Sequence, residues 1–175
     1  MSDVFHPSVP FEFILKMYLV MQEAASARGH IFQVLTKRPG RAVAWWQDHE
    51  RHFPDGWPAG IWMGTSVESQ EYAPRLTVLH RLPAPIRFVS AEPLLGRLDL
   101  TQWLENGVLQ WVIVGGESGA GARAMDLEWA RSLRDQSVNS GVAFFLKQLG
   151  GVRNKRGGEA ATIDSEHWRQ MPIME

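Results

Sequence analysis

The sequence predicts an α/β protein in which repeated strand–helix units surround a parallel sheet. Apolar runs begin at positions 31, 61, 86, 111 and 142, so successive starts are 30, 25, 25 and 31 residues apart. This spacing matches the length of one strand followed by one helix. The runs also lack polar alternation, which is typical of strands buried on both faces, as parallel strands with covering helices are.

A helix is predicted before the first strand. Apolar residues recur at helical spacing from Phe11 onward, and the pattern stops at Gly29. Ser8 stands where a capping side chain is expected, and Pro10 falls in the predicted first turn. The sequence therefore predicts a capped helix that ends at the glycine.

The strand–helix units follow in order. The predicted strands cover residues 31–35, 61–64, 86–89, 111–114 and 142–146. Helical or short connecting segments follow the first four strands, at residues 43–49, 72–79, 98–103 and 127–138. Asp126 is expected to cap the last of these helices and Gly141 to end it. Five units wound in one direction fit a partial (β/α) barrel or an open doubly wound sheet, and spacing alone does not separate the two.

Composition places the chain among globular proteins and excludes several function classes. Of its 175 residues, 45% are hydrophobic and 21% are charged, and the formal net charge is −1. The chain has no cysteine, which excludes disulfides, thiol nucleophiles and Cys-ligated zinc or iron–sulfur sites formed by this chain unaided. It has no run of about 18 apolar residues and no signal-peptide pattern, so we expect a cytoplasmic protein that spans no membrane.

The chain divides into two predicted parts. Residues 1–150 hold the strand–helix units and form the α/β domain. Residues 151–175 hold a C-terminal tail and a basic, glycine-rich loop with Arg153, Lys155 and Arg156. A solvated loop explains these charges, and contact with a nucleic-acid backbone is the functional alternative.

Polar side chains follow every predicted strand directly. In parallel α/β folds, ligands bind beyond the carboxyl ends of the strands, where loops and helix N-termini converge. We therefore expect one pocket formed by Lys37 and Arg38, Ser66 and Glu68, Ser90 and Glu92, Glu117 and Ser118, and Lys147 and Gln148. The alternative is that these residues serve as helix caps and loop starts.

Residues 115–121 place four glycines in seven positions directly after a predicted strand. Glycine lets the backbone approach a ligand closely, although this pattern is neither G-x-G-x-x-G nor a phosphate-binding loop. A tight strand-to-helix turn is the alternative explanation of these glycines, and such a turn does not require Glu117.

His49 and His52 share a predicted helix face but lack an evident third ligand, so no metal site is predicted.

A series of motifs at the strand ends resembles one protein family. The motifs are Leu-Thr-Lys-Arg-Pro at 35–39, Gly-Thr-Ser-Val-Glu at 64–68, Phe-Val-Ser-Ala-Glu-Pro-Leu-Leu-Gly at 88–96 and Val-Ile-Val-Gly-Gly-Glu-Ser-Gly at 112–119. Phe-Phe-Leu-Lys-Gln at 144–148 and Trp-Arg-Gln-Met-Pro at 168–172 extend the match. Over essentially its whole length, the chain resembles the phage-associated, radical-SAM-like family of uncharacterised proteins found in bacteria and their phages.

The resemblance implies a partial (β/α) barrel and radical chemistry on an unknown substrate. An iron–sulfur cluster would cleave S-adenosylmethionine, and the barrel mouth would hold the substrate away from water. The cofactor-binding residues that it implies are Thr65, Ser66, Glu68, Gly115, Gly116, Glu117 and Ser118. The pocket residues that it implies are Lys37, Arg38, Ser90, Glu92, Lys147 and Gln148, with the cations neutralising a carboxylate or a phosphate.

The chain departs from this family at its start. Full-length members begin with a segment of three cysteines that resembles a cluster ligand set, whereas residues 1–6 of this chain match the motif that follows that segment. We therefore expect a truncated member in which the first unit or two of the barrel is missing. Met1 is then expected to be an internal methionine of a longer reading frame, the alternative being the start of a shortened gene. Such a chain would bind no cluster or cofactor alone, would be inactive, and would self-associate through its unpaired sheet edge.

Two other functions stay open. In the first, the chain is a cluster-free module that binds nucleic acid or a partner protein. In the second, it is an ordinary barrel enzyme that uses carboxylates for acid–base chemistry. The enzyme alternative requires a strongly raised pKa on Glu92 or Glu117.

Overall fold

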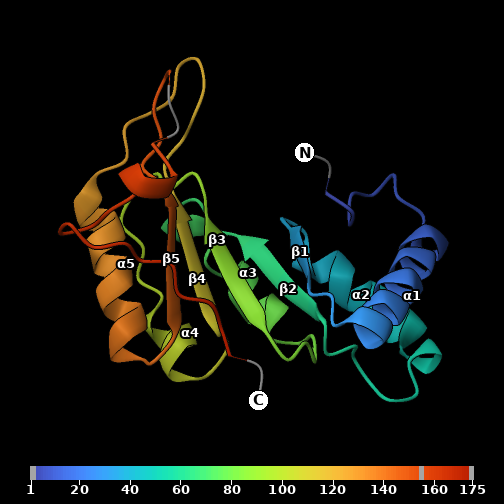
Figure 1. The fold of residues 1–175 in the computed structure, drawn as a ribbon. Coiled ribbons are helices and arrows are strands. Elements are labelled where there is room, and N and C mark those ends of the chain that lie inside the picture. Colours follow the sequence, from blue (N-terminus) through green and yellow to red (C-terminus); the bar gives the residue numbers. More distant parts are fainter. Residues whose placement is uncertain (1–2, 154–155, 174–175) are drawn as a thin grey trace.

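The computed structural model describes residues 3–153 and 156–173, which form a five-stranded sheet flanked by helices (Figure 1). Neighbouring strands follow one another in chain order, and every pair is parallel. The strands are β1 (Phe32–Thr36), β2 (Ile61–Ser66), β3 (Arg87–Ala91), β4 (Trp111–Gly115) and β5 (Ala143–Gln148). The predicted α/β class, with strand–helix units around a parallel sheet, is confirmed.

The helices are α1 (Phe11–Arg28), α2 (Pro39–His49), α3 (Arg75–Leu79), α4 (Thr101–Glu105) and α5 (Leu127–Asn139). Short 3₁₀ helices cover Glu50–His52, Gln70–Tyr72 and Gly158–Ala160. Because α3 and α4 have only five residues each, the connections after β2 and β3 are mostly loop. None of the described helices is long and apolar enough to cross a membrane.

Three of the predicted helix ends can be checked against the backbone. Gly29 adopts the left-handed conformation, with φ of 67°, and ends α1 as predicted. The predicted cap by Ser8 is wrong, because Pro10 occupies the N-cap position and no side chain caps the helix. The prediction for α5 is confirmed, since the Asp126 side chain accepts a hydrogen bond from the Glu128 N–H at 2.9 Å.

The two faces of the sheet differ in what covers them. Side chains alternate along each strand, so that Met63 packs with the helices while Trp62 points to the opposite face. The helix-side core takes buried residues from every labelled helix, including Tyr18, Trp45, Leu76, Leu104 and Leu133. The opposite face has a separate buried cluster of Trp62, Ile86, Phe88, Trp111 and Ile113, to which no described helix contributes a buried residue. All helices therefore lie on one side of the sheet.

The C-terminal tail covers the outer edge of β5. The Leu146 N–H donates to the Trp168 carbonyl at 2.8 Å, and the Gln170 N–H donates to the Phe144 carbonyl at 3.0 Å. The Trp111 indole N–H also donates to the Gln170 carbonyl at 2.9 Å. By contrast, no described strand pairs with the outer edge of β1. Self-association through that edge stays a prediction.

Candidate functional site

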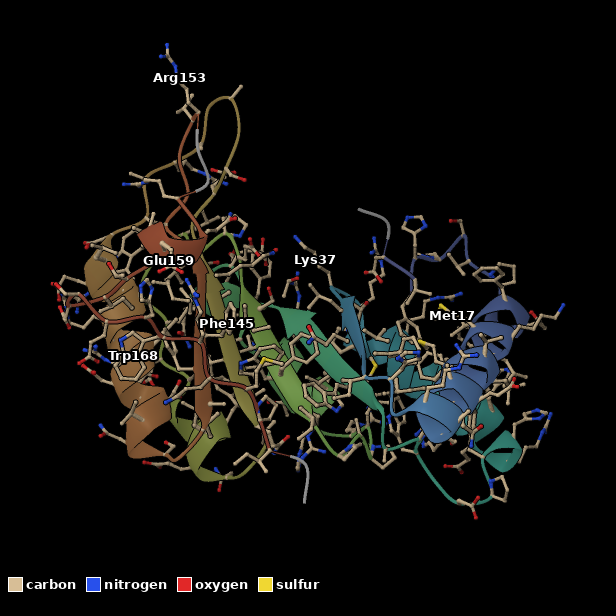
Figure 2. All side chains as sticks on the ribbon, in the orientation of Figure 1. Met17, Lys37, Phe145, Arg153, Glu159 and Trp168 are labelled. Atoms are coloured by element: carbon tan, nitrogen blue, oxygen red, sulfur yellow. The ribbon has the colours of Figure 1, made fainter. Side chains whose placement is uncertain are left out.

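A cavity of about 800 Å³ lies at the carboxyl ends of the strands, and we call it the mouth groove. Its walls come from the N-terminal segment before α1 and from residues at or just beyond the ends of β1, β2, β3 and β5. Because all strands are parallel, their carboxyl ends meet at one edge of the sheet. Figure 2 shows Lys37 at this edge.

The structure brings together eight of the ten strand-end residues that were expected to form one pocket, all except Glu68 and Glu117. Lys37, Arg38, Ser90, Glu92, Lys147 and Gln148 line the mouth groove. Of the predicted cofactor-binding residues, Ser66 and Ser118 also line it. Asp3 and Thr36 line it as well, although neither was predicted to be a site residue.

Three ion pairs among the described residues stand along the groove. They join Lys37 to Glu68, Arg38 to Asp3 (2.9 Å) and Lys147 to Glu92 (2.8 Å). The side chains of the cations are 40–56% exposed, whereas those of the carboxylates are 8–21% exposed. In each pair the cation is therefore more exposed than the carboxylate, although Asp3 and Glu92 themselves line the groove and only Glu68 is buried.

Glu68 does not face the groove as predicted, because it is buried beneath two cations. Arg75 on α3 pairs with its carboxylate at 3.2 Å and also donates to the Ser66 carbonyl at 2.7 Å. The Arg75 guanidinium in turn lies 4.2 Å from the centre of the Tyr72 ring. Glu68 thus holds Lys37 in place from below, and no sequence signal had pointed to Arg75.

The Asp3 carboxylate is the most heavily bonded acid of the groove. It accepts hydrogen bonds from the Thr36 hydroxyl (2.8 Å), the Lys37 N–H (3.0 Å), the Phe5 N–H (2.9 Å) and the Arg38 guanidinium (2.9 Å). Burial alone would raise the pKa of Asp3, but these hydrogen bonds together hold it below its ordinary value. Asp3 therefore carries a negative charge at neutral pH.

Glu117 faces Arg123 and does not line the groove. Its carboxylate accepts from the Arg123 Nε (2.7 Å), Nη2 (2.9 Å) and backbone N–H (2.9 Å). The hydrogen bonds from the Arg123 side chain, followed by the one from its backbone N–H, lower the pKa of Glu117 to about 2. The enzyme alternative that needs a raised pKa on Glu117 is therefore wrong for this residue.

Two glycines at the end of β4, Gly115 and Gly116, pack closely against other parts of the protein. A Cβ on Gly116 would lie 2.2 Å from the Leu149 carbonyl oxygen, and a Cβ on Gly115 would lie 3.1 Å from Glu92 Cγ. Close packing against the segment after β5 at Gly116, and against the Glu92 side chain at Gly115, explains why neither position carries a side chain. That these glycines bind a cofactor stays a prediction. Gly119, with φ of 111°, serves the turn that follows.

Thr65 also lies away from the groove. It is fully buried on the helix side of the sheet, and its hydroxyl donates to the Thr36 carbonyl at 2.8 Å. The prediction that it contacts a cofactor is therefore not supported by its position. Gln148 does line the groove, but its amide donates to the Gly116 carbonyl at 2.8 Å. This bond holds the segment after β4 against the end of β5.

Two loops project beyond the carboxyl edge of the sheet, and we call residues 116–126 and 150–153 the arm (Figure 1). Hydrogen bonds join the loops at their base, where the Gly151 N–H donates to the Glu117 carbonyl at 2.8 Å. Arg153 stands at the tip (Figure 2). Arg156 folds back and donates to the Gly150 carbonyl at 2.7 Å. Lys155 of the predicted basic loop lies outside the described residues.

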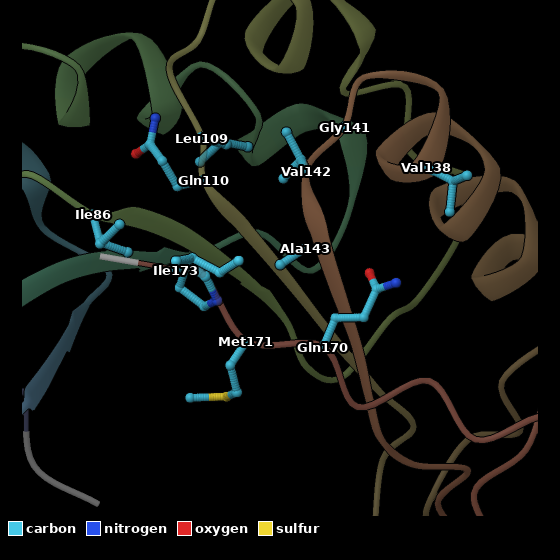
Figure 3. Close-up of a pocket in the computed structure, with 11 residues that line it drawn as sticks. Ile86, Leu109, Gln110, Val138, Gly141, Val142, Ala143, Gln170, Met171 and Ile173 are labelled. Carbon is cyan, nitrogen blue, oxygen red and sulfur yellow. The ribbon is translucent and has the colours of Figure 1, made fainter. Parts of the chain in front are cut away.

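A second cavity of about 590 Å³ lies at the opposite end of the sheet, between the tail and the starts of β3, β4 and β5 (Figure 3). Apolar residues such as Ile86, Leu109 and Met171 line it, and none of its described lining residues is charged. Its two amide side chains, Gln110 and Gln170, are hydrogen-bonded to backbone groups, so the cavity offers no charged partner to a ligand. Among residues 3–153 and 156–173, no three His, Asp or Glu side chains are grouped as metal ligands.

Comparison with known proteins gives one match. A family model described as a protein of unknown function (DUF5131) matches residues 1–172. No curated protein and no solved structure matches the chain.

Proposed function

We propose that this chain, which belongs to the DUF5131 family of proteins of unknown function, binds an anionic ligand in the mouth groove. The observation that carries this proposal is the exposure of the three groove ion pairs, in each of which the cation is far more exposed than the carboxylate. Exposed ammonium and guanidinium groups favour carboxylate or phosphate oxygens, with which they form charge-assisted hydrogen bonds.

The rest of the groove supports a small polar ligand. The hydroxyls of Ser66 and Ser90 lie between the cations contributed by β1 and those contributed by β5. Hydroxyls donate and accept, so they suit the polar body of a ligand whose charged group contacts a lysine or arginine. A cavity of about 800 Å³ is also large enough for a nucleotide-sized molecule.

We further propose that the sheet is part of a partial (β/α) barrel. Strands in chain order with all helices on one side are what a singly wound barrel requires, whereas a doubly wound sheet reverses its order and carries helices on both faces. In this proposal the face with Trp62, Phe88 and Trp111 is the interior side. The mouth groove is then the barrel mouth.

We propose that the radical-SAM-like resemblance bears on which ligand the groove binds, and we propose no radical chemistry for this chain. An iron–sulfur cluster needs thiolate ligands, and these 175 residues include no cysteine. The described residues also offer no group of three other metal ligands. The chain therefore does not fit the cluster, and we derive no radical step. S-adenosylmethionine stays a candidate ligand because its carboxylate matches the groove cations.

A nucleic-acid strand is the second candidate ligand. Arg153 stands at the tip of the arm, toward the same carboxyl end of the sheet as Lys37 (Figure 2). It therefore extends the exposed positive charge beyond the groove. Phosphate contacts of this kind give binding that weakens steeply with salt. A short oligothymidine therefore belongs among the probes.

Replacing Lys147 with methionine should weaken anion binding about tenfold, because one charge-assisted contact is lost and Glu92 is left unpaired beside the groove. Isothermal titration with inorganic phosphate, S-adenosylmethionine and oligothymidine measures the change. Lys147→Arg should retain most of the affinity, and Lys16→Met, on an exposed position of α1, should leave it unchanged.

Equal affinity in Lys147→Met and Lys16→Met would contradict the proposal, as would a wild-type protein that binds none of the three probes. Binding of oligothymidine alone, with a steep salt dependence, would favour the second candidate.

A further inference from the structure

The β1 end of the mouth groove holds a ready-made anion site. The Thr36 hydroxyl, the Lys37 N–H and the Arg38 guanidinium all donate to the Asp3 carboxylate, at 2.8–3.0 Å. All three donors belong to consecutive residues at the end of one strand, whereas the carboxylate comes from a separate segment of the chain. The same three donors would therefore bind any oxyanion that took the place of the Asp3 carboxylate.

Two of these donors, the Thr36 hydroxyl and the Lys37 N–H, are held in place independently of Asp3. The Arg38 N–H donates to the Thr36 hydroxyl oxygen at 2.9 Å, which leaves the hydroxyl proton free to point into the groove. The Thr36 carbonyl accepts from Thr65 on the neighbouring strand, and Thr36 is almost fully buried. A site whose donors are already oriented binds an anion without reorganising.

The N-terminal segment is anchored by contacts that do not involve the Asp3 side chain. Phe5 anchors it, since this side chain is fully buried with its ring centre 6.4 Å from that of Tyr18 and 6.0 Å from that of Trp45. Asp3 lies two residues before this anchor, so a rotation of its side chain and adjoining backbone is enough to vacate the site. Asp3, Thr36 and Arg38 all line the same groove, so an entering ligand reaches the vacated position directly.

We propose that the Asp3 carboxylate occupies an anion subsite of the mouth groove and that a carboxylate or phosphate group of the ligand displaces it. This inference rests on the proposed anion-binding function of the groove and adds its regulation. A carboxylate tethered beside the donors competes at a high effective concentration. The apparent affinity of the ligand is then reduced by the fraction of molecules in which Asp3 fills the site.

Replacing Asp3 with alanine should raise the affinity for inorganic phosphate about tenfold, because the competitor is removed while its donors remain. Isothermal titration of wild type and Asp3→Ala measures the change. The gain should disappear in the double variant Asp3→Ala/Arg38→Met, which removes a donor of the subsite, and should persist in Asp3→Ala/Arg28→Met, which removes an exposed arginine at the end of α1.

Asp3→Asn provides a second variant that keeps the side-chain shape and loses the negative charge, and a rise in phosphate affinity is expected for it too. Equal phosphate affinity in wild type, Asp3→Ala and Asp3→Asn would overturn the inference. So would a failure of both variants to fold, because Asp3 would then be purely structural. Failure of the proposed function itself looks different, since none of the variants would bind phosphate.

Discussion

Replacing Arg87 with methionine should lower the free energy of unfolding by about 3 kcal/mol, because buried carbonyl groups lose their hydrogen-bond donor. Arg87 begins β3, at the end of the sheet opposite the mouth groove. Its guanidinium donates to carbonyls of two separate loops, those of Ala84 at 2.8 Å, Val108 at 2.9 Å, Gly107 at 3.3 Å and Leu82 at 3.4 Å.

The environment of Arg87 explains the size of this effect. Burial lowers the pKa of its guanidinium, and none of the described carboxylates forms an ion pair with it. Its charge is therefore stabilised by carbonyl dipoles. Lysine would keep the charge but, with one nitrogen, cannot reach both loops in the same way. Arg87→Lys should thus lose most of the same stability.

Urea unfolding followed by circular dichroism measures this loss. Arg81→Met is the matched control, because Arg81 is exposed in the neighbouring segment and should change stability by less than about 0.5 kcal/mol. Similar unfolding midpoints for Arg87→Met and Arg81→Met would show that the carbonyl contacts contribute little. Phosphate affinity should be unchanged in both variants, since neither residue lines the groove.

Replacing Gly116 with alanine should destabilise the protein by about 3 kcal/mol, at the upper end of the range for overpacking. The added Cβ would lie 2.2 Å from the carbonyl oxygen of Leu149 and 2.7 Å from its carbonyl carbon. Both are backbone atoms, so a side chain cannot simply rotate out of the way. The segments after β4 and β5 would have to separate, which displaces the base of the arm and Lys147.

Gly96→Ala is the control for Gly116→Ala. A Cβ on Gly96 meets no other atom within 4 Å, and its backbone conformation is not one that favours glycine. Thermal unfolding should therefore show a large loss for Gly116→Ala and almost none for Gly96→Ala. Equal melting temperatures for the two variants would mean that the crossing of the two segments is looser than the structure shows.

The sheet was largely predictable from the sequence because its central strands, β2, β3 and β4, are buried on both faces. Such strands appear as short apolar runs at regular spacing, and each predicted run coincides with an observed strand to within about two residues at either end, the usual scatter of element boundaries. The connections were less predictable. α3 and α4 are too short to leave a clear helical periodicity, since five residues make little more than one turn.

The position of the groove was predictable, whereas its electrostatics were not. Polar residues after parallel strands predicted Lys37, Glu92 and Lys147 at one edge, because the carboxyl ends of parallel strands meet there. The pairing of Lys147 with Glu92, 55 residues away, depends on the end of β5 lying near the residue that follows β3. Asp3 likewise depends on tertiary structure for its contacts with Thr36 and Lys37, which lie more than 30 residues further along the chain.

The glycines after β4 show why a motif alone does not identify a physical role. A glycine-rich segment after a strand indicates close approach to something, and the sequence does not say to what. Here the approach is to the backbone of Leu149. The signal for close approach was therefore correct, and at Gly116 the approached group is protein backbone.

The most direct test of the proposed anion site is a titration of the ¹⁵N-labelled protein with inorganic phosphate, followed through its backbone amide resonances. The predicted result is that the largest shifts occur at the strand ends around Lys37, Ser66, Ser90 and Lys147. Shifts confined to the second cavity around Ile86 and Met171, or no shifts up to millimolar phosphate, would contradict the central claim that the mouth groove binds anions.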